Sequence, residues 1–189
     1  MKIGILQLNS TIGDFESNRQ KLVAAYEQAV QQGAEFVIAP ELFLCGYPPR
    51  DLLLRPDFIE ANLTTLAKTA DVVGAVPLGV GFADRNPARP GRSLFNSVAI
   101  LQAGKIIWRQ NKSLLPTYDV FDEDRYFEPA RDVAPMVFKG VRLGVTICED
   151  VWNDRDFWPS RLYHRDPVEE LADQHTDLFI NISASPFTL

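Results

Sequence analysis

Apolar and polar residues alternate along this chain with two different periods, which predicts strands interleaved with helices. Residues 141–147 (VRLGVTI) are apolar at every second position, as in a strand with one buried face. In residues 22–30 the apolar positions recur three and four residues apart, which predicts an amphipathic helix. Asp14 is a suitable N-cap for that helix, and Gly33 is suited to follow its C-terminus. We therefore expect an α/β fold.

The other predicted elements follow from the same two patterns. Helices are expected at residues 51–70, in two pieces broken at Pro56, and at residues 167–174. A turn at residues 102–104 predicts a hairpin. The expected strands are residues 2–8, 36–39, 71–82, 94–101, 105–109, 136–138 and 178–182, of which 71–82 and 178–182 are apolar runs expected to be buried.

Composition narrows the class of protein. With 189 residues, the chain is expected to form one domain, residues 1–189. A net charge of −6 without a local basic cluster argues against nucleic-acid binding. The N-terminus has no signal-peptide pattern, and no apolar run approaches bilayer length, so we expect no membrane segment and a cytoplasmic protein. Cys45 and Cys148 are accordingly expected as free thiols.

Three polar residues directly follow predicted strands. Glu41 lies just beyond the strand that Pro40 ends, Lys112 follows the second hairpin strand, and Cys148 follows residues 141–147. Residues at neighbouring strand ends can converge in one crevice of an α/β sheet. Each also has a plain structural explanation, because free cysteines are often packing residues and exposed glutamate and lysine are usually solvated.

The sequence around these residues resembles the nitrilase, or carbon–nitrogen hydrolase, superfamily with its Glu-Lys-Cys triad. The matching strings are APELFLCGYP, NKSLLPTYDVFDEDRYF, GVTICEDVW and NISASPF. Within the superfamily, GYPPRDLL, LPTYDVFDEDRYF and CEDVW are most similar to the glutaminase domain of glutamine-dependent NAD synthetases, and this resemblance covers essentially the whole chain.

The resemblance implies a nitrilase-like four-layer α-β-β-α sandwich that assembles into a homo-oligomer. Family glutaminase domains continue beyond the strand equivalent to residues 178–182, so the fold is expected to be incomplete at its C-terminus. The synthetase domain, with its SGGxDS motif, has no counterpart in this sequence. No cofactor is expected in the glutaminase domain, whereas ATP, magnesium and deamido-NAD are expected to bind the synthetase domain.

The resemblance also implies roles for individual residues. Cys148 would attack the side-chain amide of glutamine, with Lys112 favouring the thiolate. Glu41 would accept the thiol proton, pass it to ammonia and then activate water against the thioester. Lys112 and the backbone N–H of Glu149 would stabilise the oxyanion. The positions that match the family's glutamine pocket are Tyr47, Tyr118, Phe121 and Glu123, with Ser185 at the α-amino or carboxylate end.

Other chemistries have weaker support in the sequence. Residues 122–124 (DED) suggest a divalent metal, but they lack a second ligand cluster, so we expect a solvated acidic turn and no metal. Gly79 and Gly81 form a GxG without a third glycine, which close strand packing explains better than nucleotide binding. A papain-like mechanism would need His164 or His175, and both lie in polar segments.

Three functions therefore remain open. The first is the glutaminase part of an NAD synthetase, releasing ammonia to a synthetase domain that amidates deamido-NAD with ATP. The second is a free-standing nitrilase-type amidase that acts on another small amide. The third is a fragment without catalytic activity that serves as an interaction module.

Overall fold

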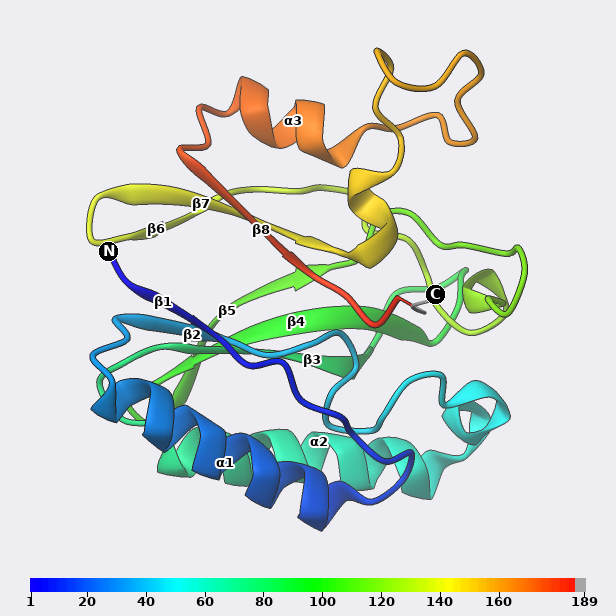
Figure 1. Cartoon of the computed structure of the whole chain (residues 1–189). Coiled ribbons are helices and arrows are strands. Elements are labelled where there is room, and N and C mark those ends of the chain that lie inside the picture. The colour runs from blue at the N-terminus through cyan, green and yellow to red at the C-terminus, as the bar shows by residue number, and fades with distance from the viewer. Residues whose placement is uncertain (186–189) are drawn as a thin grey trace.

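Two β-sheets pack face to face between helices in a computed structural model that describes residues 1–185 (Figure 1). One sheet has the order β1-β2-β3-β4-β5: Ile3–Ile5, Phe36–Ile38, Leu78–Arg85, Leu94–Gln102 and Lys105–Asn111. The other has the order β6-β7-β8: Met136–Phe138, Val141–Ile147 and Leu178–Ile182. Helices α1 (Phe15–Gln31) and α2 (Pro56–Val72) cover the first sheet, and α3 (Pro167–Asp173) covers the second. The predicted α-β-β-α layers are confirmed.

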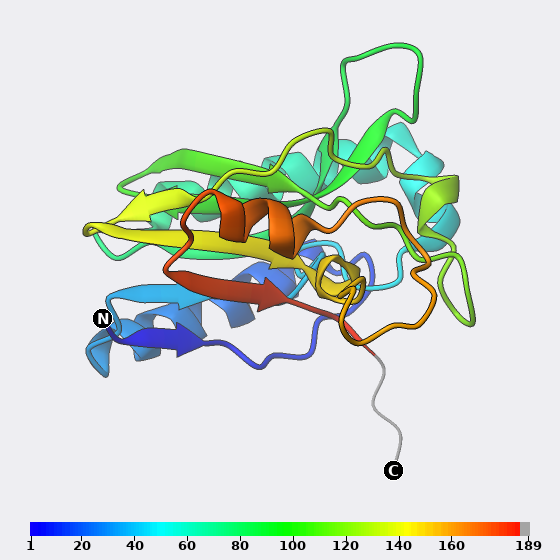
Figure 2. The ribbon, with the colours of Figure 1, turned by 90° about the horizontal axis from the view of Figure 1, so that it is seen from above.

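Strand directions bring distant residues to one edge of the larger sheet. Strands β1, β2 and β3 are parallel, whereas β4 is antiparallel to both β3 and β5. Strand β5 therefore runs in the same direction as β2, and their carboxyl ends lie at the same edge. In the second sheet β7 is parallel to β8. Figure 2 shows that residues 152–164 loop outward beyond the carboxyl end of β7, before α3 begins.

Each side of the larger sheet has its own hydrophobic core. Between the sheets, the buried side chains include Phe36, Val98, Ile100, Leu143 and Ile147. Beneath α1 and α2, they include Leu22, Tyr26, Leu66, Val80 and Phe82. Burying an aliphatic or aromatic side chain of this size contributes about 1.5–3 kcal/mol, so both layers of contacts hold the strand ends in place.

The capping residues and the proline predicted from the sequence mark the helix ends. The Asp14 carboxylate accepts the backbone N–H of Ser17 at 3.3 Å, which confirms the N-cap. Gly33 has φ +83° just past the helix end, as predicted. The break at Pro56 is also confirmed, because the 3₁₀ helix η1 (Arg50–Leu54) precedes α2.

Two strand predictions need correction. The strand predicted at residues 71–82 starts only at Leu78, because α2 extends to Val72. An apolar run alone does not distinguish a buried helix end from a strand. Strand β8 is buried on one face only: Ile180 and Ile182 are buried, whereas Phe179 is 39% exposed. It is an edge strand whose outer face is partly uncovered.

The two glycines of β3 are explained by close packing, as predicted. A Cβ at Gly79 would lie 2.2 Å from Cδ1 of Ile38 in β2. A Cβ at Gly81 would lie 2.3 Å from the backbone nitrogen of Leu42 and 2.6 Å from the carbonyl oxygen of Pro40. The loop that carries Glu41 therefore lies directly on the β3 backbone.

Candidate active site

A buried lysine lies between two carboxylates at the edge where β2 and β5 end. Lys112 follows β5, is fully buried, and has Nζ 2.8 Å from Glu41 Oε1 and 2.9 Å from Glu123 Oε1. Its backbone is fixed as well, since its N–H donates to Asn96 and its carbonyl accepts from Ala130. Charges this deep require partners, and these two carboxylates supply them.

Asn96, near the start of β4, contacts the same two carboxylates. Its Nδ2 donates to Glu41 Oε1 at 2.8 Å and to Glu123 Oε2 at 3.3 Å. Sequence analysis did not identify Asn96. The available signal was a polar pair, Asn96-Ser97, inside an otherwise apolar strand. One amide therefore bridges two groups of like charge.

Further donors complete the environment of the carboxylates. The backbone N–H of Ala184 donates to Glu41 Oε2 at 3.1 Å, and Tyr47 Oη donates to Glu123 Oε1 at 2.8 Å. Burial, followed by the charge of Glu123, raises the pKa of Tyr47, so its hydroxyl stays protonated and able to donate. Both carboxylates are thus oriented by hydrogen bonds from several elements.

Cys148 lies at the sharp turn where β7 gives way to the 3₁₀ helix η3 (Cys148–Val151). It has φ +44°, a conformation that costs a residue with a Cβ about 1–2 kcal/mol. The residue is 4% exposed, and its Sγ lies 3.4 Å from the hydroxyls of both Ser183 and Ser185. The second sheet thus brings a buried thiol to the edge where Glu41 and Lys112 lie.

A tyrosine pair surrounds the carboxylate next to Cys148. Glu149 accepts hydrogen bonds from Tyr118 at 2.8 Å and from Tyr163 at 2.9 Å. Phe121 packs between Tyr118 and Tyr47, with ring centroids at 5.6 and 6.2 Å. All of these except Tyr163 were predicted as substrate-binding residues, and for Glu149 the group named was its backbone N–H. Its side chain faces an aromatic wall and offers a negative charge there.

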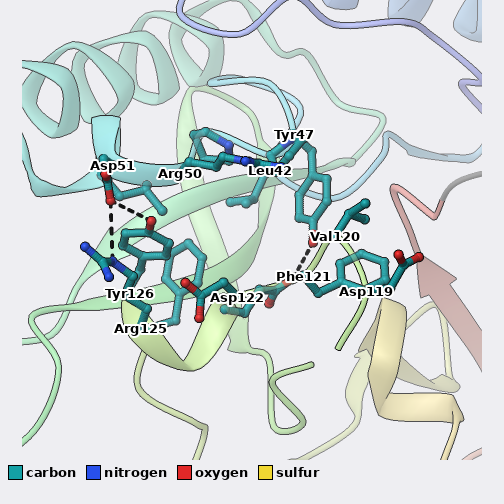
Figure 3. A pocket seen from close by; sticks show the side chains of 15 residues that line it. Leu42, Tyr47, Arg50, Asp51, Asp119, Val120, Phe121, Asp122, Arg125 and Tyr126 are labelled. Carbon is teal, nitrogen blue, oxygen red and sulfur yellow. Dashed lines mark hydrogen bonds and ion pairs between the residues drawn. The ribbon is translucent and has the colours of Figure 1, made fainter. Parts of the chain in front are cut away.

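Two cavities border this cluster. One, of about 380 Å³, reaches Tyr47, Phe121 and Glu123 (Figure 3). In the same view, on the side of this cavity away from Tyr47, Asp51 accepts a hydrogen bond from Tyr126 and forms an ion pair with Arg125. The other, of about 320 Å³, is lined by Tyr118, Glu149, Trp152, Trp158, Ser160, Leu162 and Tyr163. The aromatic wall at Tyr118 and Phe121 separates the two spaces.

Comparison with known proteins identifies the family. The sequence pattern of the carbon–nitrogen hydrolase family matches residues 2–159. The chain belongs to the carbon–nitrogen hydrolase family. Among its relatives is a glutamine-dependent NAD(+) synthetase from Synechocystis, which is 44% identical over 98% of this chain but over only 34% of its own length.

Solved structures give the same picture for this carbon–nitrogen hydrolase. A glutamine-dependent NAD+ synthetase from Acinetobacter baumannii superposes with a TM-score of 0.85 at 31% identity, covering 98% of this chain and 32% of that one. An amidase from Nesterenkonia superposes with a TM-score of 0.77 at 20% identity, covering 99% of this chain and 66% of that one. The chain thus spans about a third of the synthetases it matches.

Lys112 acts on the Cys148 thiol of this carbon–nitrogen hydrolase in the expected direction, but other groups outweigh it. Burial, followed by the Glu41 charge, raises the pKa of Cys148, and Lys112 opposes the shift without reversing it. Burial alone would lower the pKa of Lys112, but Glu41 and Glu123 raise it above its ordinary value. The cation persists while the thiol remains protonated.

The acidic turn differs from the expected solvated cluster. Asp122 and Asp124 are exposed, but the 3₁₀ helix η2 (Glu123–Arg125) turns Glu123 inward to Lys112. Burial raises the pKa of Glu123, against the pull of Lys112. Within residues 1–185, no three His, Cys, Asp or Glu side chains are grouped so that they could hold a metal ion.

The two histidines and the second cysteine lie apart from the residues that surround Lys112. His164 and His175 are exposed, as predicted. Cys45 is a packing residue, and burial raises the pKa of its thiol to about 12. Of the NISASPF string, Pro186 and Phe187 lie outside the described residues. No helix in the described part of the chain has the length and apolar character to cross a bilayer.

Proposed function

We propose that this chain is the glutaminase part of a glutamine-dependent NAD synthetase, hydrolysing glutamine to glutamate and ammonia through a thioester on Cys148. The observation that carries the proposal is the Lys112 ammonium held between Glu41 and Glu123 beside the Cys148 turn. The two synthetases that share 44% and 31% identity with nearly the whole chain support the choice of substrate.

The reaction starts from a protonated thiol. Because burial and Glu41 raise the pKa of Cys148, Glu41 takes the thiol proton as Sγ attacks the amide carbon. Lys112 and the backbone N–H of Glu149 stabilise the oxyanion, where losing one donor typically costs about 2.7–4 kcal/mol. When the carbon–nitrogen bond breaks, Glu41 returns the proton to the leaving ammonia. Water, deprotonated by Glu41, then cleaves the thioester and restores the thiol.

Substrate recognition in this proposal uses the groups around Glu149. Its carboxylate would bind the α-ammonium of glutamine beside Tyr118 and Tyr163, both of which already donate to it. Phe121 would pack against the aliphatic part of the substrate. Ser185, with Oγ 3.4 Å from Sγ, borders the amide end. In a longer protein, the ammonia would pass to an ATP- and magnesium-dependent synthetase domain that amidates deamido-NAD, and the whole would form a homo-oligomer.

The experiment is a measurement of glutamate and ammonia released from glutamine. Cys148→Ala and Glu41→Gln should each abolish release, because they remove the nucleophile and the base. Cys45→Ala is the matched control, since Cys45 is a second buried thiol in the core. Undiminished hydrolysis by Cys148→Ala would show that the mechanism is wrong.

A free-standing amidase is the second candidate, because the whole chain shares its fold with the Nesterenkonia amidase. Rates on glutamine, aliphatic amides and N-carbamoyl compounds separate the two. We expect kcat/KM to be highest for glutamine because Glu149 offers a partner for an α-ammonium. A preference for simple aliphatic amides would favour the amidase. Failure of a glutamine-like electrophile to label Cys148 would favour a chain without catalytic activity.

A further inference from the structure

Asp150 accepts hydrogen bonds from three backbone N–H groups although it is almost completely buried. Its Oδ1 accepts from Ser113 and from Leu114, both at 2.9 Å, and its Oδ2 accepts from Ile147 at 2.9 Å. The side chain is 1% exposed, and none of the ion pairs in the described residues involves it. One carboxylate thus serves entirely as an acceptor for main-chain groups.

The three donors lie at or just beyond the ends of strands that belong to two different sheets. Ser113 and Leu114 directly follow Lys112 at the end of β5, in the five-stranded sheet. Ile147 directly precedes Cys148 at the end of β7, in the three-stranded sheet. The Asp150 carboxylate therefore ties the residue after the lysine to the residue before the cysteine, across the gap between the sheets.

The turn at Cys148 needs such a tie. Its φ of +44° is rarely adopted by residues other than glycine and persists only where the surroundings fix it. A buried carboxylate is a costly means of fixing a turn, and burial raises the pKa of Asp150 to about 6 even though the three N–H donors lower it. Asp150 therefore connects the segment that carries Lys112 to the segment that carries Cys148.

We propose that Asp150 is a positioning residue that sets the location of Cys148 Sγ relative to Lys112 and Glu41. The inference rests on the proposed function, because it assumes that these three groups act together on one amide. Asp150 itself touches no substrate; it acts through the backbone on either side of it. Loss of one of its hydrogen bonds shifts the sulfur relative to the other two groups.

Asp150→Asn is the test, since it keeps the shape of the side chain. The amide oxygen still accepts from Ser113 and Leu114, but its NH₂ now faces the N–H of Ile147, where two donors oppose each other. A displacement near 1 Å at a reacting atom costs about 100-fold, so we expect kcat per folded molecule to fall about 10- to 100-fold. KM for glutamine should change by less than about 3-fold, because Glu149 and Tyr118 are unaltered.

Asn62→Ala is the matched control. Asn62 in α2 is also fully buried and anchors backbone, donating to the carbonyl of Ala83 at 2.6 Å and accepting its N–H at 3.4 Å. We expect it to lower the melting temperature while leaving kcat per folded molecule unchanged. Circular dichroism measures the folded fraction for each variant. Asp150→Ser is the second variant and is used if Asp150→Asn does not fold. Its shorter side chain does not place a donor against the N–H of Ile147.

The outcomes separate this inference from the proposed function. A fall in kcat with unchanged KM for the Asp150 variant, but not for Asn62→Ala, supports the positioning role. Unchanged kcat per folded molecule, a rise in KM alone, or unfolding of both Asp150 variants overturns it. Glutamine hydrolysis that survives Cys148→Ala, or none by the unaltered protein, would instead contradict the proposed function.

Discussion

Replacing Lys112 with methionine tests whether the buried cation holds the cluster together. Lys112 is fully buried, and its Nζ contacts Glu41 at 2.8 Å and Glu123 at 2.9 Å. Removing one partner of a buried ion pair costs about 3–5 kcal/mol, because the remaining charge keeps its desolvation penalty. Total stabilities are about 5–15 kcal/mol, so Lys112→Met should remove a large part of the free energy of unfolding.

The loss should also depend on pH. Without the cation, the carboxylate oxygens of Glu41 and Glu123 lie within about 6 Å of each other, close enough for the charge of Glu41 to raise the pKa of Glu123 further. Burial already raises the pKa of Glu123. A carboxyl whose folded-state pKa exceeds its unfolded value is most favourable when protonated, below that pKa, and destabilises the fold as pH rises through it. Lys112→Met should therefore lose less stability at pH 5 than at pH 8.

The assay is urea unfolding followed by circular dichroism at both pH values. Lys139→Met is the matched control, because Lys139 pairs with Glu35 on the surface, where it is 56% exposed, and its loss should have little effect. Adding Glu123→Gln to Lys112→Met should recover part of the stability by removing one of the two like charges. An equal, pH-independent loss in both lysine variants, or a further loss in the double variant, would refute the reasoning.

Three further predictions concern the thiol, the bridging amide and the proposed substrate carboxylate. Alkylation of Cys148 by iodoacetamide should have a pH midpoint above the ordinary thiol pKa of 9.0, and Glu41→Gln should lower that midpoint because it removes a negative charge. A midpoint below 9.0 in the unaltered protein would contradict this prediction. Asn96→Asp should lower kcat/KM for glutamine about 10-fold or more, because Glu41 loses the hydrogen bond from Asn96 and faces a second carboxylate; an unchanged kcat/KM would exclude a role for Asn96 at that carboxylate. Glu149→Gln should raise KM for glutamine about 10- to 100-fold with little change in kcat, since a hydrogen bond to a charged group contributes about 1.5–3 kcal/mol; steady-state kinetics with an unchanged KM would remove Glu149 from substrate binding.

Residues whose roles depend on local pattern were predictable from the sequence. Glu41, Lys112 and Cys148 each follow an apolar run, and residues at strand ends can converge, but it was the family resemblance that predicted them as one triad. Most helix boundaries also followed from periodicity and caps, whereas the four layers were expected only from the family resemblance. The strand expected at residues 71–82 failed because apolar content does not separate a helix end from a strand.

Residues whose roles depend on the fold around them were not predictable from local pattern. Glu123 was expected in the site only from the family resemblance, because its own acidic run looks solvated and only the turn of η2 directs this one carboxylate inward. Asn96 belongs to the site only because it donates hydrogen bonds to two glutamates that are 55 and 27 residues away in sequence. Asp150 likewise accepts hydrogen bonds from backbone groups that lie 36 and 37 residues earlier, just beyond a strand end. A hydrogen bond between residues so far apart in sequence cannot be predicted from composition.

The packing of Gly81 has a consequence for the proposed base. A methyl group at this position would lie 2.3 Å from the Leu42 nitrogen, so the segment bearing Glu41 would have to rise from the sheet to admit it. Because Glu41 reaches Lys112 at only 2.8 Å, even a small lift would part the two charges. The proposed proton transfer therefore depends in part on the lack of a side chain at Gly81, in a strand that contributes none of the residues described in the candidate active site.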